Sequence, residues 1–377
     1  MTIIMAAQQR GRGRVTLTDF EPEFLPVRPE GERIWVVRAS GGAYVGHFRE
    51  HGLMAIGHLN PLGLRQGAIS QGTLPNLEAL LLRADSERSQ GSLTSHANQA
   101  RTFISGISEG DLIVTLNSGS ISVGRVAGDA FISRESLYIY DKNGRSYALE
   151  HELRRKVIWG PRLLRTQVPA ALQLTLLAHQ TVFNIDDYWD SIYHLLYPCF
   201  AYRDHLYLSA NIKQTLELDN YSLSQFFSML SAIERTARDL AEGLEVGHTP
   251  KRHREDLNLT TKAEFMSPGT IWAQVAMDSQ SLLWCAVIYV MLFGGDLKFF
   301  KTDGLLDTHT RQKIWDVVIK IVKDFDFSRV QKRLRVDIPR VDTSKIDPPK
   351  PKRIRKAKIK RENEPAQLPQ EDDPDLG

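Results

Sequence analysis

The sequence predicts an α+β protein with two ordered regions, each with its own sheet and helices. Its 377 residues are enough for two domains, because one domain typically takes about 100–200 residues. Residues 31–186 contain several short runs rich in β-branched residues, which favours a small sheet. In residues 187–335, strand-like segments alternate with longer helical stripes, which favours a second α+β unit.

The two ends of the chain differ from these regions. Residues 1–30 contain Arg, Gly and Pro without sustained periodicity, which predicts a flexible lead-in. Residues 336–377 have no apolar pattern and run from a basic block into an acidic end, which predicts a disordered tail. The basic block could hold nucleic acid loosely through counterion release, although the acidic end would compete for the same charges.

Composition narrows the class of protein only modestly. Basic residues number 48 and acidic residues 45, so the net charge of +3 neither requires nor excludes a nucleic-acid partner. The only cysteines are Cys199 and Cys285, which make neither a disulfide framework nor a zinc site. The N-terminus does not resemble a signal peptide, and the longest apolar run, residues 282–293, is shorter than the roughly 20 residues that span a bilayer. We therefore expect a cytoplasmic protein with no membrane partner and a buried helix at this run.

The first region is predicted to form a curved sheet or an open barrel with flanking helices. One helix is expected near residues 77–83, and a second over 95–107, where apolar residues recur on one face. The strands are expected at residues 33–38, 53–57, 112–116, 121–126, 136–140 and 153–159. So many short strands around few helices are typical of small, strongly curved sheets.

The second region is predicted to be helical at residues 186–198 and extended at 210–218. Ser222-Leu-Ser-Gln225 matches a capping box and is followed by a helical apolar stripe. Two extended segments are then expected within residues 257–277, before an apolar helix after Gln280 and an amphipathic helix over 310–325. The role of this region is not evident from these elements.

An ordered set of short motifs in residues 33–185 resembles a known module. The motifs are Trp35-Val-Val-Arg-Ala39, Gly52-Leu-Met-Ala-Ile-Gly57, Asn98-Gln99, Glu109-Gly-Asp-Leu-Ile-Val114, Val123-Gly-Arg-Val126, Arg155-Lys-Val-Ile-Trp159 and Gln180-Thr-Val-Phe-Asn-Ile185. In this order they resemble the EVE-like domain of the PUA superfamily, found at the N-terminus of some Mrr-type, modification-dependent restriction proteins. The resemblance implies a nucleic-acid reader, with modified DNA favoured over RNA, in a prokaryotic anti-phage defence or restriction setting.

Domains of this kind extrude one nucleotide and hold its base in a pocket, so the resemblance also implies base flipping. Flipping costs a few kcal/mol, which stacking and base-edge hydrogen bonds in the pocket offset. After the Ala-Ile-Gly strand the family commonly has tryptophan, whereas this chain has His58. Histidine stacks more weakly and can change charge near neutral pH, so the base modification preferred by relatives does not carry over.

Five residues of the first region are candidates for binding the base, each with a structural alternative. Trp35 could stack on the base or fill the core. Arg38 could hold a phosphate or base edge or form a surface ion pair. His58 could line the pocket or be a loop histidine with satisfied hydrogen bonds. Asn98 and Gln99 could read a base edge or cap a helix.

A basic cluster at the end of this region is a candidate for binding phosphate. It consists of Arg154, Arg155, Lys156, Arg162 and Arg165. Contact with a nucleic-acid backbone would use such a cluster, but a solvated charged face would have the same composition.

The sequence names no catalytic residue, metal ligand or cofactor. It has no Walker A loop and no His-Glu-x-x-His zinc helix. The nearest approach to a nuclease motif is Asp278 with Asp296 and Lys298, but an apolar, helix-like segment separates them. Three hypotheses follow: a binding protein that reads modified DNA and uses its second region for assembly with itself or a defence partner, a modification-dependent endonuclease with an unrecognised C-terminal site, and a reader of modified RNA.

Overall fold

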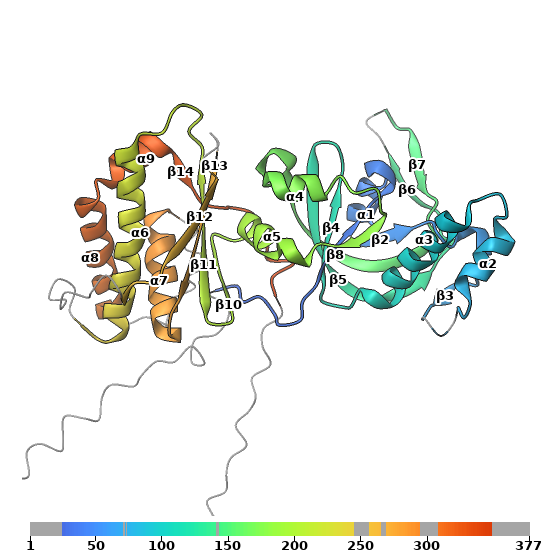
Figure 1. Ribbon diagram of the computed structural model, residues 1–377, viewed down its shortest axis with the longest axis horizontal. Coiled ribbons are helices and arrows are strands. Elements are labelled where there is room, and N and C mark those ends of the chain that lie inside the picture. Colours follow the sequence, from blue (N-terminus) through green and yellow to red (C-terminus); the bar gives the residue numbers. More distant parts are fainter. Residues whose placement is uncertain are drawn as a thin grey trace, which may run out of the picture.

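The computed structural model has two sheets, each covered by helices, and a separate two-stranded hairpin (Figure 1). It describes residues 25–70, 72, 74–140, 143–244, 256–264, 269–294 and 308–348. The fold is therefore α+β, as the sequence predicts.

The first sheet has seven strands in the order β2-β8-β5-β4-β1-β9, with β3 paired to β5. Its strands are β1 (Ile34–Val37), β2 (Leu53–Ile56), β3 (Gly67–Ala68), β4 (Leu112–Leu116), β5 (Ser120–Ile132), β8 (Leu153–Leu164) and β9 (Val182–Asn184). Only β1 and β4 pair in parallel within this sheet. The hairpin consists of β6 (Leu137–Tyr140) and β7 (Ser146–Leu149).

Helices cover both faces of the first sheet. Trp35 and Val37 of β1 pack with α1 (Val45–Glu50), α2 (Leu77–Ala84) and α3 (Gln90–Arg101). Ile34 and Val36 point to the other face, where α4 (Ala170–Thr175) and α5 (Trp189–Leu196) contribute to the core. Because both faces are covered, the central strands read as continuous apolar runs rather than as alternating ones.

The sheet curves so that its two edges approach one site. Strand β2 is at one edge and β9 at the other, and among the described strands none pairs β2 with β9. Yet His58, which follows β2, and Thr181, which precedes β9, line the same cavity. The sheet is therefore strongly curved and unclosed, with the cavity between its edges.

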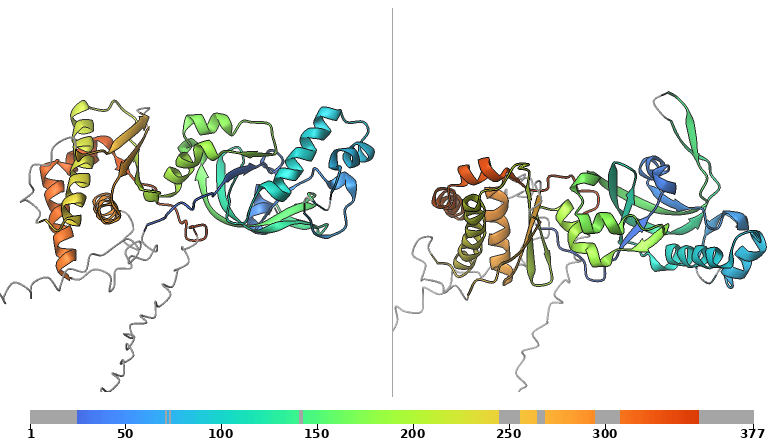
Figure 2. Two further views of the ribbon diagram at one scale, coloured as in Figure 1. Left: turned by 60° about the horizontal axis from the view of Figure 1, so that its bottom comes forward. Right: turned by 45° about the horizontal axis from the view of Figure 1, so that its top comes forward.

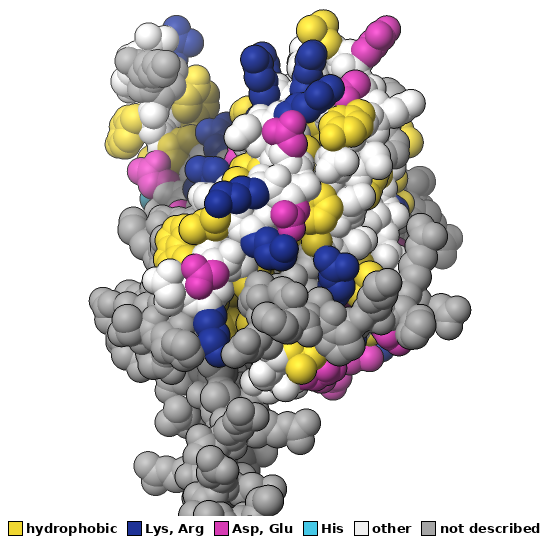
Figure 3. All heavy atoms as spheres, turned by 90° about the vertical axis from the view of Figure 1, so that its left-hand side faces the viewer, with side chains coloured by type: hydrophobic (Ala, Val, Ile, Leu, Met, Phe, Trp, Pro, Cys, Tyr) yellow, Lys and Arg dark blue, Asp and Glu magenta, His cyan; other side chains and the backbone are white. Residues whose placement is uncertain are grey.

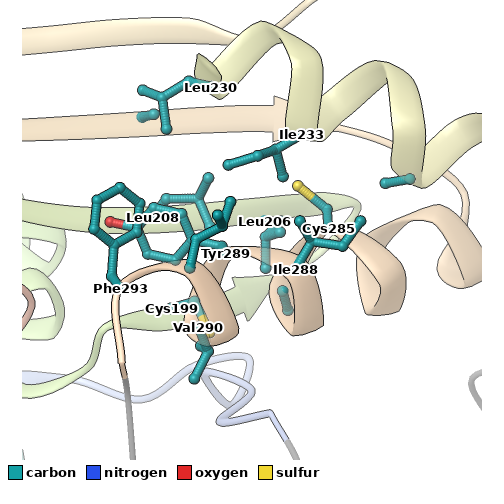
Figure 4. Packing of buried hydrophobic residues seen from close by; sticks show 14 of the residues in the cluster. Cys199, Leu206, Leu208, Leu230, Ile233, Cys285, Ile288, Tyr289, Val290 and Phe293 are labelled. Carbon is teal, nitrogen blue, oxygen red and sulfur yellow. The ribbon is translucent and has the colours of Figure 1, made fainter. Parts of the chain in front are cut away.

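The second sheet is antiparallel and carries its helices on one face. It is built from β10 (Cys199–Tyr202), β11 (His205–Ile212), β13 (Gly269–Ala276) and β12 (Thr260–Glu264), with β14 (Val336–Asp337) paired to β11. The helices are α6 (Asn220–Ala241), α7 (Ser279–Leu292), α8 (Thr308–Asp324) and α9 (Phe327–Leu334). Figure 4 shows α7 side chains packed on β11, with Cys199 and Cys285 in the same core. Burial raises the pKa of the Cys199 thiol to about 12, so it is not a reactive thiolate.

Helix α5 joins the two regions. Its Ile192 and Tyr193 lie in the core of the first sheet, whereas its His194 stacks on Trp272 of β13 with ring centroids 4.6 Å apart. The expected boundary at residue 186 thus lies just before a helix that both regions share.

Two local expectations in the second region need correction. The helix predicted to be capped by Ser222 begins one turn earlier, because the Asp219 carboxylate accepts a hydrogen bond from the Ser222 backbone N–H. The strand predicted over residues 210–218 spans His205–Ile212. It begins earlier because a turn with Arg203 at φ 54° sends the chain directly back along β10.

Both predicted disordered ends contain packed segments. Leu25 is buried in the second core, and Val27 bridges to Ala201 of β10. Ile338 and Ile346 are also buried, Ile346 in the core of the first sheet. The prediction of a flexible lead and tail is therefore wrong for residues 25–30 and 336–348, which hold single apolar anchors without periodicity. Residues 1–24 and 349–377 lie outside the described part of the chain.

Candidate functional site

A cavity of about 410 Å³ opens between the two edges of the first sheet. Its walls come from the segments after β1 and β2, from α2 and α3, and from the segments before β8 and β9. The side chains that characterise it are four histidines and two arginines: His58, His96, His151, His179, Arg38 and Arg88. Two residues selected from sequence, Arg38 and His58, therefore meet in one cavity.

His58 and His96 form a stacked pair in the wall. Their ring centroids are 4.3 Å apart and their planes differ by 4°. Burial, with a smaller contribution from the nearby His96, lowers the pKa of His58 to about 4, and a hydrogen bond from the Gln99 side chain opposes the shift. His58 is thus neutral at physiological pH. Its Nε2 is buried and has no hydrogen-bond partner among the described residues, so a ligand in the cavity could supply one.

His151 is held on another side of the cavity. Its Nε2 lies 2.8 Å from the Ser40 hydroxyl oxygen, and Tyr44 contacts its ring edge-on at 4.8 Å between centroids. Burial lowers the pKa of His151, which also favours the neutral imidazole. The cavity therefore presents flat, uncharged rings from separate parts of the chain.

The two arginines are held differently. Arg88 pairs with the Asp85 carboxylate at 2.9 Å and donates toward the His96 ring at 3.1 Å. Arg38 donates from Nη2 to the Leu176 carbonyl oxygen, and its Nε is buried without a partner among the described residues. Burial and the Arg165 charge lower the pKa of Arg38, but an arginine stays protonated at neutral pH. Arg38 thus supplies a positive charge with unused hydrogen-bonding capacity.

Gln99 fastens one edge of the sheet to α3. Its Oε1 accepts hydrogen bonds from the backbone N–H groups of Thr181 at 2.6 Å and Val182 at 3.1 Å. Thr181 lines the cavity, so Gln99 positions part of the wall. Asn98, its neighbour, is exposed, accepts a hydrogen bond from Arg101 and lies outside the cavity lining.

We expect Gln99→Ala to lower the free energy of unfolding by about 2 kcal/mol, because two backbone donors would lose their acceptor. Urea denaturation checks this, with Asn98→Ala as the matched control, for which a change below about 0.5 kcal/mol is expected at an exposed position. Equal effects of the two substitutions would contradict the positioning role of Gln99.

Trp35 does not reach the cavity. It is 4% exposed, packs in the core beneath α3, and donates its indole N–H to an Asp111 carboxylate oxygen at 3.0 Å. Its placement among the base-binding candidates is therefore corrected in favour of the core. Asp111 also accepts from the Ser108 backbone N–H, which anchors the turn before β4.

The predicted phosphate-binding cluster is divided by the fold. Arg154 and Arg155 are 2% and 1% exposed and donate to backbone carbonyl oxygens, Arg155 to those of Phe103, Ile107 and Gly128. They are structural residues that bind loops to β8, and a backbone phosphate cannot reach them. Lys156 and Arg162 are exposed and Arg165 is half-buried, so these three are accessible.

The face of the second region formed by α8 and its neighbours is of mixed charge. Figure 3 shows lysine and arginine side chains interspersed with acidic and hydrophobic ones. Lys320 and Asp324 of α8 form an ion pair at 3.2 Å, and Trp315 of the same helix is 50% exposed. A field of mixed sign is a poor attractor for a polyanion.

The nuclease motif gains no support from the described residues. Asp278 caps α7 by accepting hydrogen bonds from the backbone N–H groups of Gln280 and Ser281. Asp296 and Lys298 lie outside the described residues. Within the described ranges, no group of three or more His, Cys, Asp or Glu side chains could hold a metal ion.

Sequence reasoning missed much of the cavity. His96, His151, His179 and Arg88 come from three separate segments and follow no spacing that marks a site. Only His96 carried a local signal, because it lies one helical turn before Gln99 on α3. Their convergence depends on the curvature of the sheet.

Comparison with protein-family models, with curated proteins and with solved structures finds no match for this chain. Among the helices of the described residues, none combines the length and apolar character that crossing a membrane requires.

Proposed function

We propose that this protein binds nucleic acid and holds one unstacked, modified base in the cavity between the edges of the first sheet. The observation that carries the proposal is that Arg38 and His58 line one cavity of about 410 Å³. Pockets for small ligands occupy about 300–1,000 Å³, so a single base with a methyl or hydroxymethyl group is of a suitable size.

The chemistry of the wall agrees with a base as ligand. Neutral imidazoles stack on a flat heterocycle and exchange hydrogen bonds with its edge, as the buried Nε2 of His58 requires. Arg38 would then contact a base edge or the flanking phosphate. The exposed Lys156 and Arg162 and the half-buried Arg165 are candidates for further phosphate contacts. The resemblance of residues 33–185 to EVE-like, PUA-superfamily domains supports the same function in a restriction or anti-phage setting in the cytoplasm.

A binding panel tests the proposal. Duplexes carrying cytosine, 5-methylcytosine, 5-hydroxymethylcytosine or N6-methyladenine are compared at one salt concentration, because phosphate contacts make affinity depend on salt. We expect one modified duplex to bind more tightly than its unmodified form. Tighter binding of modified single-stranded RNA would instead favour an RNA reader, and Mg²⁺-dependent cleavage would favour an endonuclease.

We expect Arg38→Ala and His58→Ala each to weaken binding of the preferred duplex by about tenfold, since stacking of a ring on a base contributes about 1–3 kcal/mol and a hydrogen bond from a charged group about 1.5–3 kcal/mol. Fluorescence anisotropy measures the affinities. Arg235→Ala and His205→Ala on the second region are the matched controls and should bind as wild type does. Unchanged affinity in both cavity variants would refute this placement of the base.

A further inference from the structure

The β6–β7 hairpin projects from the body of the first region as a two-stranded ribbon (Figures 1 and 2). Three tyrosines on it are exposed: Tyr138 by 47%, Tyr140 by 72% and Tyr147 by 47%. Alternate residues of a strand share a face, so Tyr138 and Tyr140 lie on one face, and the directly paired Ile139 and Tyr147 lie on the other. Aromatic side chains exposed together on a projecting ribbon indicate a contact surface.

The base of the ribbon is fixed to α1. His47 Nε2 lies 2.7 Å from the Tyr147 carbonyl oxygen, and His51 Nε2 lies 3.1 Å from that of Tyr138. Ile139 packs closely over Gly46 of α1, where an added Cβ would lie 2.9 Å from its Cδ1. Ile139 therefore faces the body, and Tyr138 and Tyr140 face away from it. A ribbon held in this way presents its tyrosines in a fixed orientation.

The ribbon begins beside the cavity. Strand β7 ends at Leu149, which is 2% exposed, and two residues later His151 lines the cavity. The Asn60 side chain donates to the Glu150 carbonyl oxygen at 2.8 Å, and Ser40 contacts His151, so the link is held on both sides. A nucleic acid with one base in the cavity would therefore have its neighbouring nucleotides close to the ribbon.

The dimensions of the ribbon suit duplex DNA and not duplex RNA. Strands rise about 3.3 Å per residue and lie about 4.8 Å apart, and a two-stranded ribbon fits the major groove of B-form DNA, which is about 12 Å wide. The major groove of A-form RNA is deep and narrow and does not admit such an element.

We propose that the β6–β7 hairpin enters the major groove of duplex DNA beside the base held in the cavity, with Tyr138 and Tyr140 contacting the groove. This inference rests on the proposed function and adds to it the substrate class: duplex DNA rather than duplex RNA. The cavity selects the base, and the ribbon supplies affinity for the surrounding duplex.

The test compares wild type with Tyr138→Thr/Tyr140→Thr, in which threonine keeps the preference for a strand. Affinities are measured by anisotropy for the modified DNA duplex, its unmodified form, the modified single strand and an RNA duplex of the same sequence. We expect the double variant to bind both DNA duplexes about tenfold more weakly, with the ratio between them and the affinity for the single strand unchanged. Wild type should bind the DNA duplex more tightly than the RNA duplex.

Tyr221→Ala, at an exposed tyrosine on α6, is the control and should leave all affinities unchanged. Unchanged duplex affinity in the double variant, with weaker binding in the cavity variants, would overturn the role of the hairpin and leave the proposed function standing. Equal affinity of wild type for the DNA and RNA duplexes would overturn the major-groove assignment. Failure of wild type to bind any of the nucleic acids would overturn the proposed function itself.

Discussion

Lowering the pH from 7 to 5 is expected to reduce the free energy of unfolding by about 4 kcal/mol, because the half-buried His58 and the buried His194 resist protonation in the folded protein. Burial lowers the pKa of His58 to about 4 and that of His194 to about 3, with neighbouring positive charge a smaller cause. The Nδ1 of His194 is bonded to the Ser209 hydroxyl at 2.8 Å, and its ring stacks on Trp272.

The direction follows from proton binding. In the unfolded chain both rings take up a proton near pH 6.5, whereas in the folded chain they do so only near pH 4 and pH 3. Between these values the unfolded state binds more protons, so stability falls as the pH falls from 6.5 toward 4 through His58 and toward 3 through His194. At pH 5 each ring accounts for about 2 kcal/mol.

Urea denaturation at a series of pH values measures the effect. His194→Asn is expected to remove about half of the loss between pH 7 and pH 5, and His58→Asn/His194→Asn most of it. Equal stability of the wild-type protein at pH 7 and pH 5 would show that these rings are accessible to protons in the folded state and would contradict the prediction.

Arg125→Met is expected to lower the free energy of unfolding by about 3–5 kcal/mol, because it leaves the buried Glu32 carboxylate without its main partner. Arg125 Nη1 lies 2.7 Å from Glu32 Oε1, and Arg125 Nε donates to the Ile346 carbonyl oxygen at 2.9 Å. Burial alone would lower the pKa of Arg125, but the Glu32 carboxylate outweighs it and the net shift is upward. The Tyr193 hydroxyl donates to Glu32 Oε2 at 2.6 Å.

This network connects β5, the segment before β1, helix α5 and the segment after β14, so its loss should loosen the segments around Glu32 and Ile346. Denaturant unfolding measures the change, and limited proteolysis reports release of the segment around Ile346. Lys156→Met, at an exposed position of β8, is the control and should change stability by less than about 0.5 kcal/mol. Glu32→Gln/Arg125→Met should recover part of the loss. A loss below about 1 kcal/mol in Arg125→Met would argue against the network.

Local pattern was sufficient for most of the secondary structure. The strand predicted at residues 112–116 coincides with β4, because a strand buried on both faces must be apolar at every position. The helix predicted at residues 77–83 corresponds to α2, since its apolar spacing defines the face that packs against α3. The strand and the helix each depend on residues that are close in sequence, so a short stretch of sequence is enough to predict them.

The cavity was only partly predictable. Arg38 and His58 could be selected because Arg38 ends one predicted strand and His58 directly follows another, where side chains reach the rim of a sheet. His96, His151 and His179 could not, because they join the others only when the sheet curves and brings its edges together.

The sequence alone determined most of the helices and strands of this protein and its α+β class. It also determined the strand ends at which the cavity residues Arg38 and His58 lie. Tertiary structure decided which charges are accessible: Arg154 and Arg155 look like a binding cluster, yet both are buried and donate hydrogen bonds to the carbonyl oxygens of Glu135 and Phe103, respectively. It also decided that the single apolar residues Leu25 and Ile346 are anchors. The reason is physical. Periodicity records which face of an element is buried, whereas the burial of one polar or isolated apolar side chain depends on partners that lie far away in the chain.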